Sequence, residues 1–199
     1  VTPSAALADG DYSLEAKATD AAGNISPESL SISVTIDTTA PNAPTSLVDI
    51  SGTNDTTPTI TGTAEANSTI TLFNGNEVIG TATTDSEGDF SVIPSNSLAD
   101  GDYSLEAKAT DAAGNISSES SSISITIDTV VPEAPSSLAT TSSDTNDTTP
   151  TITGTAEANS TITLFNGNEV IGTATTDSEG DFSVIPSNSL ADGDYSLEA

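Results

Sequence analysis

The sequence contains no cysteine, methionine, tryptophan, histidine or arginine. Lys17 and Lys108 are its only basic residues, against 30 acidic residues, and the formal net charge is −28. The missing cysteines exclude disulfides and thiolate metal sites. Nucleic-acid binding is not expected, because phosphate contacts depend on Lys and Arg, and an anionic membrane surface would repel the chain. No apolar run approaches the roughly 18 residues of a membrane span, so membrane insertion is not expected either.

Long stretches of the sequence are repeated. Residues 53–107 recur letter for letter as residues 145–199, and the segment ADGDYSLEAKATDAAGNIS occurs at residues 8–26 and again at residues 99–117. A period of about 90 residues is too long for a solenoid repeat and fits a self-contained domain. The variable segments IDTTAPNAP and IDTVVPEAP contain prolines, which restrict the backbone, so they mark the junctions. We therefore predict the last part of a module at residues 1–37, a complete module at residues 38–128 and the first part of a module at residues 129–199, as in a piece of a longer array.

Short alternating runs fill each module and are separated by turn residues at intervals of about eight to twelve positions, which is typical of a β-sandwich. Within residues 38–128 the pattern predicts seven strands and no helix, with Leu47 in the first strand. Tyr103 follows an Asp-Gly turn just before the sixth strand, where immunoglobulin-like sandwiches place a tyrosine corner that bonds upstream backbone. We predict an all-β fold of tandem immunoglobulin-like, seven-stranded Greek-key β-sandwiches in an extended array.

Four segments, APNAPTSL, TPTITGTAEANSTITLF, DGDYSLEAKATDAAGNIS and ITIDTTAP, together resemble the bacterial Ig-like repeats of giant Gram-negative surface adhesins. These adhesins are the biofilm-associated proteins and the RTX adhesins of type I secretion. The resemblance implies an extracellular protein of the cell surface, in which neighbouring repeats of one chain carry a distal binding domain outward. It also implies calcium at the module junctions. The Gly- and Asp-rich nonapeptide of RTX proteins is absent from the sequence.

Acidic side chains are predicted to converge at one end of each module. In a Greek-key sandwich the loops after strands two, four and six share one pole, and the incoming linker reaches the same pole. Calcium takes six to eight oxygen ligands from carboxylates and carbonyls. We therefore predict a Ca²⁺ site built from Asp37, Glu65 and Asp111, completed by Asn115 or a nearby carbonyl. The equivalent residues are Asp128 and Glu157 at the next junction, and Asp20 and Asn24 at the preceding site.

Other interpretations compete with this one. Asp and Asn are also favoured in turns for local reasons, without any ion. Paired carboxylates hydrolyse glycosides in some enzymes, but this chain has no His or Cys to act as base or thiol nucleophile, so we predict that it is not an enzyme. A row of threonines suggests a module that binds ligands, glycans or ice, although threonine also simply favours strands; the row is Thr57, Thr59, Thr61 and Thr63. A last alternative is head-to-tail complementation, in which residues 1–37 of one chain add strands to residues 129–199 of another.

Overall fold

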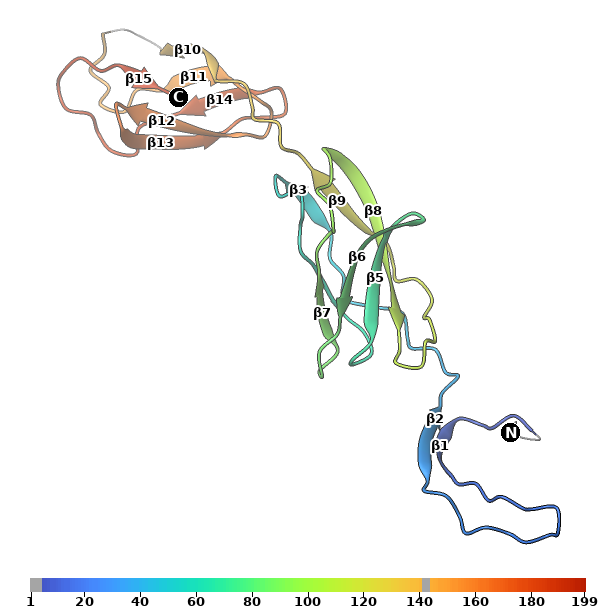
Figure 1. The fold of residues 1–199 in the computed structure, drawn as a ribbon. Coiled ribbons are helices and arrows are strands. Elements are labelled where there is room, and N and C mark those ends of the chain that lie inside the picture. Colours follow the sequence, from blue (N-terminus) through green and yellow to red (C-terminus); the bar gives the residue numbers. More distant parts are fainter. Residues whose placement is uncertain (1–4, 141–143) are drawn as a thin grey trace. The chain divides into compact units, whose positions relative to one another are not determined.

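A computed structural model describes residues 5–140 and 144–199. All regular secondary structure of these residues is β-strand, and the chain divides into two units, Val1–Thr129 and Val130–Ala199 (Figure 1). The all-β prediction is therefore confirmed. Among the described residues there is no helix with the length and apolar character needed to span a membrane.

The first unit contains a complete sandwich of seven strands, which is the number that the sequence predicts. One sheet has the order β3-β9-β8-β5-β6 and the other pairs β4 with β7. The first and last strands of the sandwich run parallel, with Ile50 opposite Ile125, and the other pairs are antiparallel. The strands are β3 (Ile50–Thr53), β4 (Ile60–Thr63), β5 (Thr69–Asn74), β6 (Glu77–Thr83), β7 (Asp89–Val92), β8 (Gly101–Thr110) and β9 (Ile123–Ile127).

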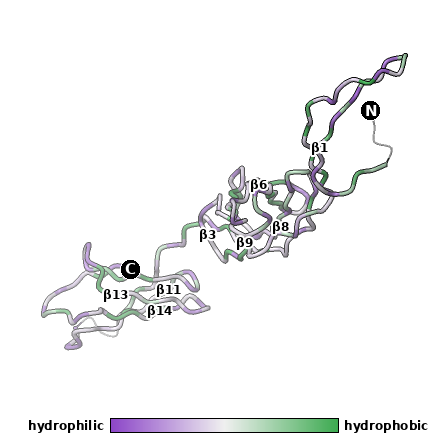
Figure 2. Tube along the Cα trace, turned by 90° about the horizontal axis from the view of Figure 1, so that it is seen from below, coloured by the Kyte–Doolittle hydropathy of each residue, from purple (hydrophilic) through white to green (hydrophobic). Residues whose placement is uncertain are grey.

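The core of this sandwich forms because apolar and polar residues alternate along its strands, so that one face of each sheet is apolar. In β8, Leu105, Ala107 and Ala109 are fully buried, and the residues between them are more exposed. Figure 2 shows that hydrophilic and hydrophobic residues are mixed along the chain, without a long hydrophobic segment. Burying each large aliphatic side chain contributes about 1.5–3 kcal/mol. The other buried apolar residues are Ile60, Ile70, Leu72, Phe90, Val92, Ile123, Ile125 and Ile127.

The first strand begins at Ile50, so its predicted position around Leu47 is wrong. Thr45 forms two backbone hydrogen bonds with Thr63, of 2.8 and 2.9 Å, which attach it to the β4 sheet. Ser46 then has a positive φ of 62°, and the chain crosses to the other sheet, where Ile50 pairs with β9. Leu47 lies at this crossing and packs, partly buried, against the core. Alternation alone does not reveal such a switch between sheets.

The prediction that four threonines lie in a row on one strand is wrong for the first two of them. Strand β4 begins at Ile60, so Thr57 and Thr59 precede it. Asp55 accepts a hydrogen bond from the Thr57 backbone N–H at 2.9 Å, which forms an Asx turn there. Only Thr61 and Thr63 lie on the strand.

Residues 5–36 form a two-stranded ribbon. Strand β1 (Gly10–Leu14) pairs antiparallel with β2 (Ile32–Ile36), with Tyr12 opposite Val34. A long loop joins the two strands, and Thr19 forms an isolated bridge with Ile25 inside it. This ribbon repeats the β8–β9 part of the complete sandwich.

The second unit repeats the β4–β7 part of the sandwich and a short piece of β8. Its two sheets have the orders β10-β11-β14 and β13-β12-β15. Its core consists of Ile152, Ile162, Leu164, Phe182 and Val184, the residues that match the β4, β5 and β7 core positions of the first unit. The strands are β10 (Ser136–Thr140), β11 (Ile152–Thr155), β12 (Thr161–Asn166), β13 (Glu169–Thr175), β14 (Asp181–Val184) and β15 (Leu197–Glu198).

The tyrosine corner predicted at Tyr103 is confirmed. The Tyr103 hydroxyl donates to the Ala99 carbonyl at 2.9 Å. The same hydrogen bond recurs from Tyr12 to Ala8 at 2.9 Å and from Tyr195 to Ala191 at 3.0 Å. The corner therefore fixes the turn before the sixth strand in every copy.

Candidate metal site at the module junction

Three loops of the complete sandwich share one end with the incoming linker, as predicted. Figure 1 shows the β4–β5, β6–β7 and β8–β9 loops at the end where the chain arrives from β2. The first two loops are joined by backbone hydrogen bonds, from Ala64 N to Gly88 O at 2.9 Å and from Asn67 N to Asp85 O at 3.3 Å. The topological argument thus predicts correctly that these loops lie at one pole.

Glu65 is held through its backbone. The hydroxyl of Thr84 donates to the Glu65 carbonyl at 2.6 Å and accepts the Ser68 N–H at 2.8 Å. Thr84 and Ser68 are both buried, so this contact is shielded from water. The Glu65 residue itself is exposed at the pole. Glu157 has the same setting in the second unit, where Thr176 donates to its carbonyl at 2.6 Å.

Asp111 and Asn115 form the part of the candidate site with the most side-chain hydrogen bonds. One carboxylate oxygen of Asp111, Oδ1, accepts the backbone N–H groups of Ala113 at 2.9 Å and Asn115 at 2.8 Å. The other, Oδ2, accepts the Asn115 side-chain amide at 2.8 Å. This side-chain hydrogen bond, ahead of the backbone donors, lowers the pKa of Asp111 below its ordinary value of 3.8, and desolvation opposes the shift. The carboxylate is therefore kept ionised, as a cation ligand must be.

Asn115 also reaches the linker. Its amide nitrogen donates to the Asp37 carbonyl at 3.1 Å, in addition to its bond with Asp111. The Asp37 carboxylate accepts the backbone N–H of Thr39 at 3.0 Å. The structure thus links Asp37, Asp111 and Asn115 by hydrogen bonds.

The acidic side chains themselves are not gathered into a cage. Within residues 5–140 and 144–199, no three His, Cys, Asp or Glu side chains are close enough together to hold a metal ion. The oxygen donors suit calcium by type, but Asn115 presents its nitrogen, not its oxygen, to Asp37 and Asp111. The Ca²⁺ site therefore stays a prediction.

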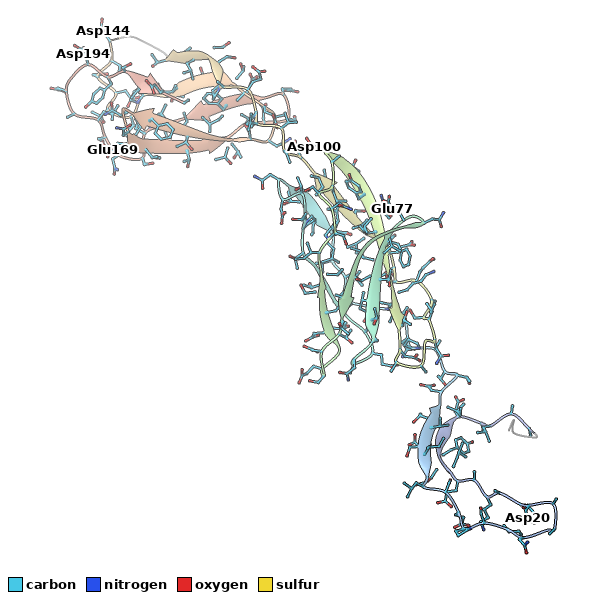
Figure 3. The ribbon with its side chains drawn as sticks, in the orientation of Figure 1. Asp20, Glu77, Asp100, Asp144, Glu169 and Asp194 are labelled. Carbon is cyan, nitrogen blue, oxygen red and sulfur yellow. The ribbon has the colours of Figure 1, made fainter. Side chains whose placement is uncertain are left out.

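The other predicted ligands repeat parts of this pattern. Asp20 Oδ1 accepts the Ala22 and Asn24 backbone N–H groups at 2.9 and 2.8 Å, and its Oδ2 accepts the Asn24 amide at 2.8 Å. The Asn24 side chain is again the main cause of a lowered pKa at Asp20. Asp20 lies in the loop between β1 and β2 (Figure 3). Asp128, at the next junction, donates its backbone N–H to the Thr53 carbonyl at 2.9 Å.

A second set of junction contacts lies at the opposite pole, where the sequence suggests Asp100 as a metal ligand from the preceding module but does not predict its hydrogen bonds to the linker. The Asp9 carboxylate accepts the hydroxyls of Thr38 at 2.8 Å and Thr39 at 3.1 Å. Asp100 accepts the hydroxyl and the N–H of Thr129 at 2.8 and 3.2 Å. Hydrogen bonds from Thr38 lower the pKa of Asp9. The signal was present in the sequence, because both linkers contain Ile-Asp-Thr at their start and Ala-Asp-Gly-Asp-Tyr recurs at the sixth-strand position of each copy.

A family match follows from the sequence and agrees with this fold. Residues 1–38, 49–129 and 132–199 match the model of the bacterial Ig-like domain. The chain belongs to the bacterial Ig-like domain family. The predicted resemblance to bacterial Ig-like repeats and the predicted immunoglobulin-like fold class are confirmed.

Individual proteins similar to this bacterial Ig-like chain include a curated enzyme and two solved structures. Chitinase A1 of Niallia circulans is 36% identical over 131 residues, which are 62% of this chain and 18% of the chitinase. A tetra-tandem repeat from the extending region of a large adhesion protein is 26% identical, with a TM-score of 0.36, covering 96% of this chain and 52% of that one. The BSP domain of a biofilm-associated protein is 24% identical, with a TM-score of 0.31, covering 79% and 26% of the two chains.

Proposed function

We propose that these bacterial Ig-like modules form a spacer segment of a surface adhesin, which holds a distal binding region away from the cell. One observation carries the proposal. A sandwich with its own core is joined to near-identical sequence on both sides by short linkers that contain prolines. Such an architecture adds length with each copy, because every module contacts its neighbours through a linker only a few residues long.

The proposed location is outside the cell, at the surface of a Gram-negative bacterium reached by type I secretion. This part of the proposal rests on the resemblance of the repeats to those of biofilm-associated and RTX adhesins. The high negative charge is compatible with it, since an acidic surface keeps a secreted array soluble.

The spacer role is tested by measuring length. Chains with one, two and three added copies of residues 38–128 should give small-angle scattering profiles whose maximum dimension grows by a constant increment for each copy. A dimension that grows with about the square root of the number of residues, as in a flexible coil, would contradict the proposal.

Calcium at the junction is proposed to stiffen the spacer. Asp111, Asn115 and the Asp37 carbonyl converge around the Asn115 amide, and a rotation of that amide by 180° would turn its oxygen toward the two other oxygens. Three oxygens facing one another repel, so this rotamer is favourable only with a cation between them. Glu65, at the same pole, is proposed to add a carboxylate. The bound ion would neutralise part of the local negative charge and tie the linker to the module that follows.

Calorimetric titration with Ca²⁺ tests this site. A concentration of 100 times the Kd should stabilise the complete module by about 2.7 kcal/mol. Asp111→Ala should abolish the heat of binding at this junction and Glu65→Gln should weaken it. Asp55→Asn, which removes a charge elsewhere on the same module, is the matched control and should leave binding unchanged. Identical scattering profiles and melting temperatures with calcium and with a chelator would refute the calcium part of the proposal.

We infer that the chain is not an enzyme, although it resembles part of a chitinase. It spans 18% of that relative's length, and its sequence contains no His or Cys. Incubation with chitin oligosaccharides should release no product. Turnover by the 199-residue chain would overturn this inference, and specific retention on a glycan array or ice shaping would instead support the alternative of a ligand-, glycan- or ice-binding module.

A specific observation favours strand complementation as a second candidate interaction. Leu14, Ile32 and Val34 are 40%, 63% and 38% exposed on the β1–β2 ribbon. Their counterparts in the complete sandwich, Leu105, Ile123 and Ile125, are 0%, 4% and 1% exposed. The ribbon of one chain would bury these residues against the second unit of another chain by displacing β15, whose Leu197 pairs with Asn166 as Leu105 pairs with Asn74 in the complete sandwich. Sedimentation should then show concentration-dependent association that Val34→Asp abolishes; a monomer at every concentration would exclude it.

A further inference from the structure

The upstream end of each linker is attached to the module that it leaves. Asp9 accepts the hydroxyls of Thr38 at 2.8 Å and Thr39 at 3.1 Å, directly after β2. Asp100 accepts the hydroxyl of Thr129 at 2.8 Å, directly after β9. Figure 3 shows Asp100 at the end of the sandwich from which the chain leaves. Because the contact recurs in two modules, it follows from the repeated sequence and not from an accident of one loop.

The tyrosine corner places this aspartate at the linker. Tyr12 fixes the Ala8 carbonyl at 2.9 Å, and Asp11 accepts the Thr35 hydroxyl at 2.6 Å. Asp9 lies between these two fixed residues, so its backbone is held at the exit of β2. The same arrangement holds Asp100, through the bond from Tyr103 to Ala99 at 2.9 Å and the bond from Thr126 to Asp102 at 2.7 Å.

The first linker is also attached to the module that it enters. The Asn115 amide donates to the Asp37 carbonyl at 3.1 Å, and Asp111 orients that amide at 2.8 Å. Pro41 and Pro44 of the linker are buried, and Thr45 already pairs with Thr63 in the sandwich. Between Asp37 and Thr45 the chain therefore has little freedom to swing.

We infer that the first residues of the linker are held from both modules by hydrogen bonds that need no cation. Asp9 holds Thr38 and Thr39 from the module before, and Asn115 holds the Asp37 carbonyl from the module after. Asp9 and Asn115 are thus positioning residues of the joint. The inference rests on the proposed spacer function and extends it. Calcium would bind to a joint that is already oriented, so that binding would cost little further conformational entropy.

Spin-label distances in the presence of a chelator test the joint directly. The chain has no cysteine, so Ser33→Cys and Ser91→Cys provide the only two thiols for labelling. Both serines are exposed, Ser33 on β2 and Ser91 on β7. The parent chain with chelator should give a narrow distance distribution. The double variant Thr38→Val and Thr39→Val removes both hydroxyl donors and keeps the size of the side chains. Its distance distribution should be broad.

Asn115→Asp separates the hydrogen bond from the metal. An aspartate cannot donate to the Asp37 carbonyl, so the narrow distribution should be lost with chelator. The same aspartate offers an oxygen ligand, so added Ca²⁺ should restore it. Thr129→Val, the matched change at the other linker, should leave the distance between positions 33 and 91 unchanged. Hydrogen exchange of the β8 amides checks that each variant keeps the sandwich folded. If Asn115→Asp does not fold, the variant with Thr38→Val and Thr39→Val tests the inference on its own.

Two results would overturn the inference. One is a broad distribution for the parent chain with chelator, and the other is a narrow distribution that survives the threonine substitutions. The proposed calcium function fails in a different way, through a melting temperature that does not respond to Ca²⁺ while the parent distribution stays narrow.

Discussion

Tyr103 shows how a single hydroxyl organises a turn, since its bond to the Ala99 carbonyl recurs in all three copies. Tyr103→Phe should destabilise the complete sandwich by about 0.5–1.5 kcal/mol, the usual net contribution of such a hydrogen bond. Faster hydrogen exchange of the β8 amides would report the loss. Tyr12→Phe, the same change in the ribbon, should leave β8 exchange as it is, and equal effects of the two substitutions would contradict the assignment.

Gly88 occupies a position in the junction loops where no other residue fits without strain. Its φ is +90°, and a Cβ there would lie 2.4 Å from the Ala64 carbonyl oxygen. Gly88→Ala should therefore cost more than the roughly 1–2 kcal/mol of a left-handed backbone alone. Gly75→Ala is the control, because Gly75 has a φ of +59° but open space around its Cβ position. Thermal melts that rank the two variants in the opposite order would refute the steric explanation.

At the scale of elements, the β8–β9 loop is expected to depend on pH. The Asn115 side chain lowers the pKa of Asp111, so the carboxylate stabilises the folded loop fully above the unfolded-state pKa, whose ordinary value is 3.8. This stabilisation is lost as the pH falls through the lower folded-state pKa. The protection factors of the Ala113 and Asn115 amides, which compare the measured exchange rate with the intrinsic rate at the same pH, should fall on acidification over that window. In Asp111→Asn this fall should be absent, and a parallel fall there would assign the effect to another group.

The elements also show what the sequence reveals and what it does not. Alternation and turn residues predicted seven strands, and topology placed Glu65, Asp111 and the linker at one pole. Those signals are local or depend only on strand order. The crossing at Ser46 depends on pairing with two different sheets, so Leu47 was misplaced. Exposed carboxylates have many rotamers of similar energy, and the pattern did not show that Asn115 would turn its nitrogen toward Asp37.

At the scale of the whole molecule, charge is the dominant feature, with a net −28 over 199 residues. Repulsion among these carboxylates opposes the compact state. Raising NaCl from about 0.01 to 0.15 M shortens the Debye length from about 30 to 8 Å, so the melting temperature should rise. A gain of about 1 kcal/mol corresponds to about 4–8 °C for a domain of this size. Choline chloride should act equally if screening is the cause, whereas an effect of NaCl alone would indicate ion binding.

The parallel pairing of the first and last strands has a mechanical consequence. The chain enters the sandwich ahead of β3 and leaves it after β9, and the two strands are neighbours that run in the same direction. The hydrogen bond from Asp128 N to Thr53 O, at 2.9 Å, extends the pairing of β3 with β9 to the point where the chain leaves the sandwich. A pulling force between the two ends of the module therefore acts on β3 and β9 in shear, and all hydrogen bonds between these two strands bear the force together. A chain of such modules resists a sudden pulling force, because unfolding must break all the hydrogen bonds between β3 and β9 together instead of one after another.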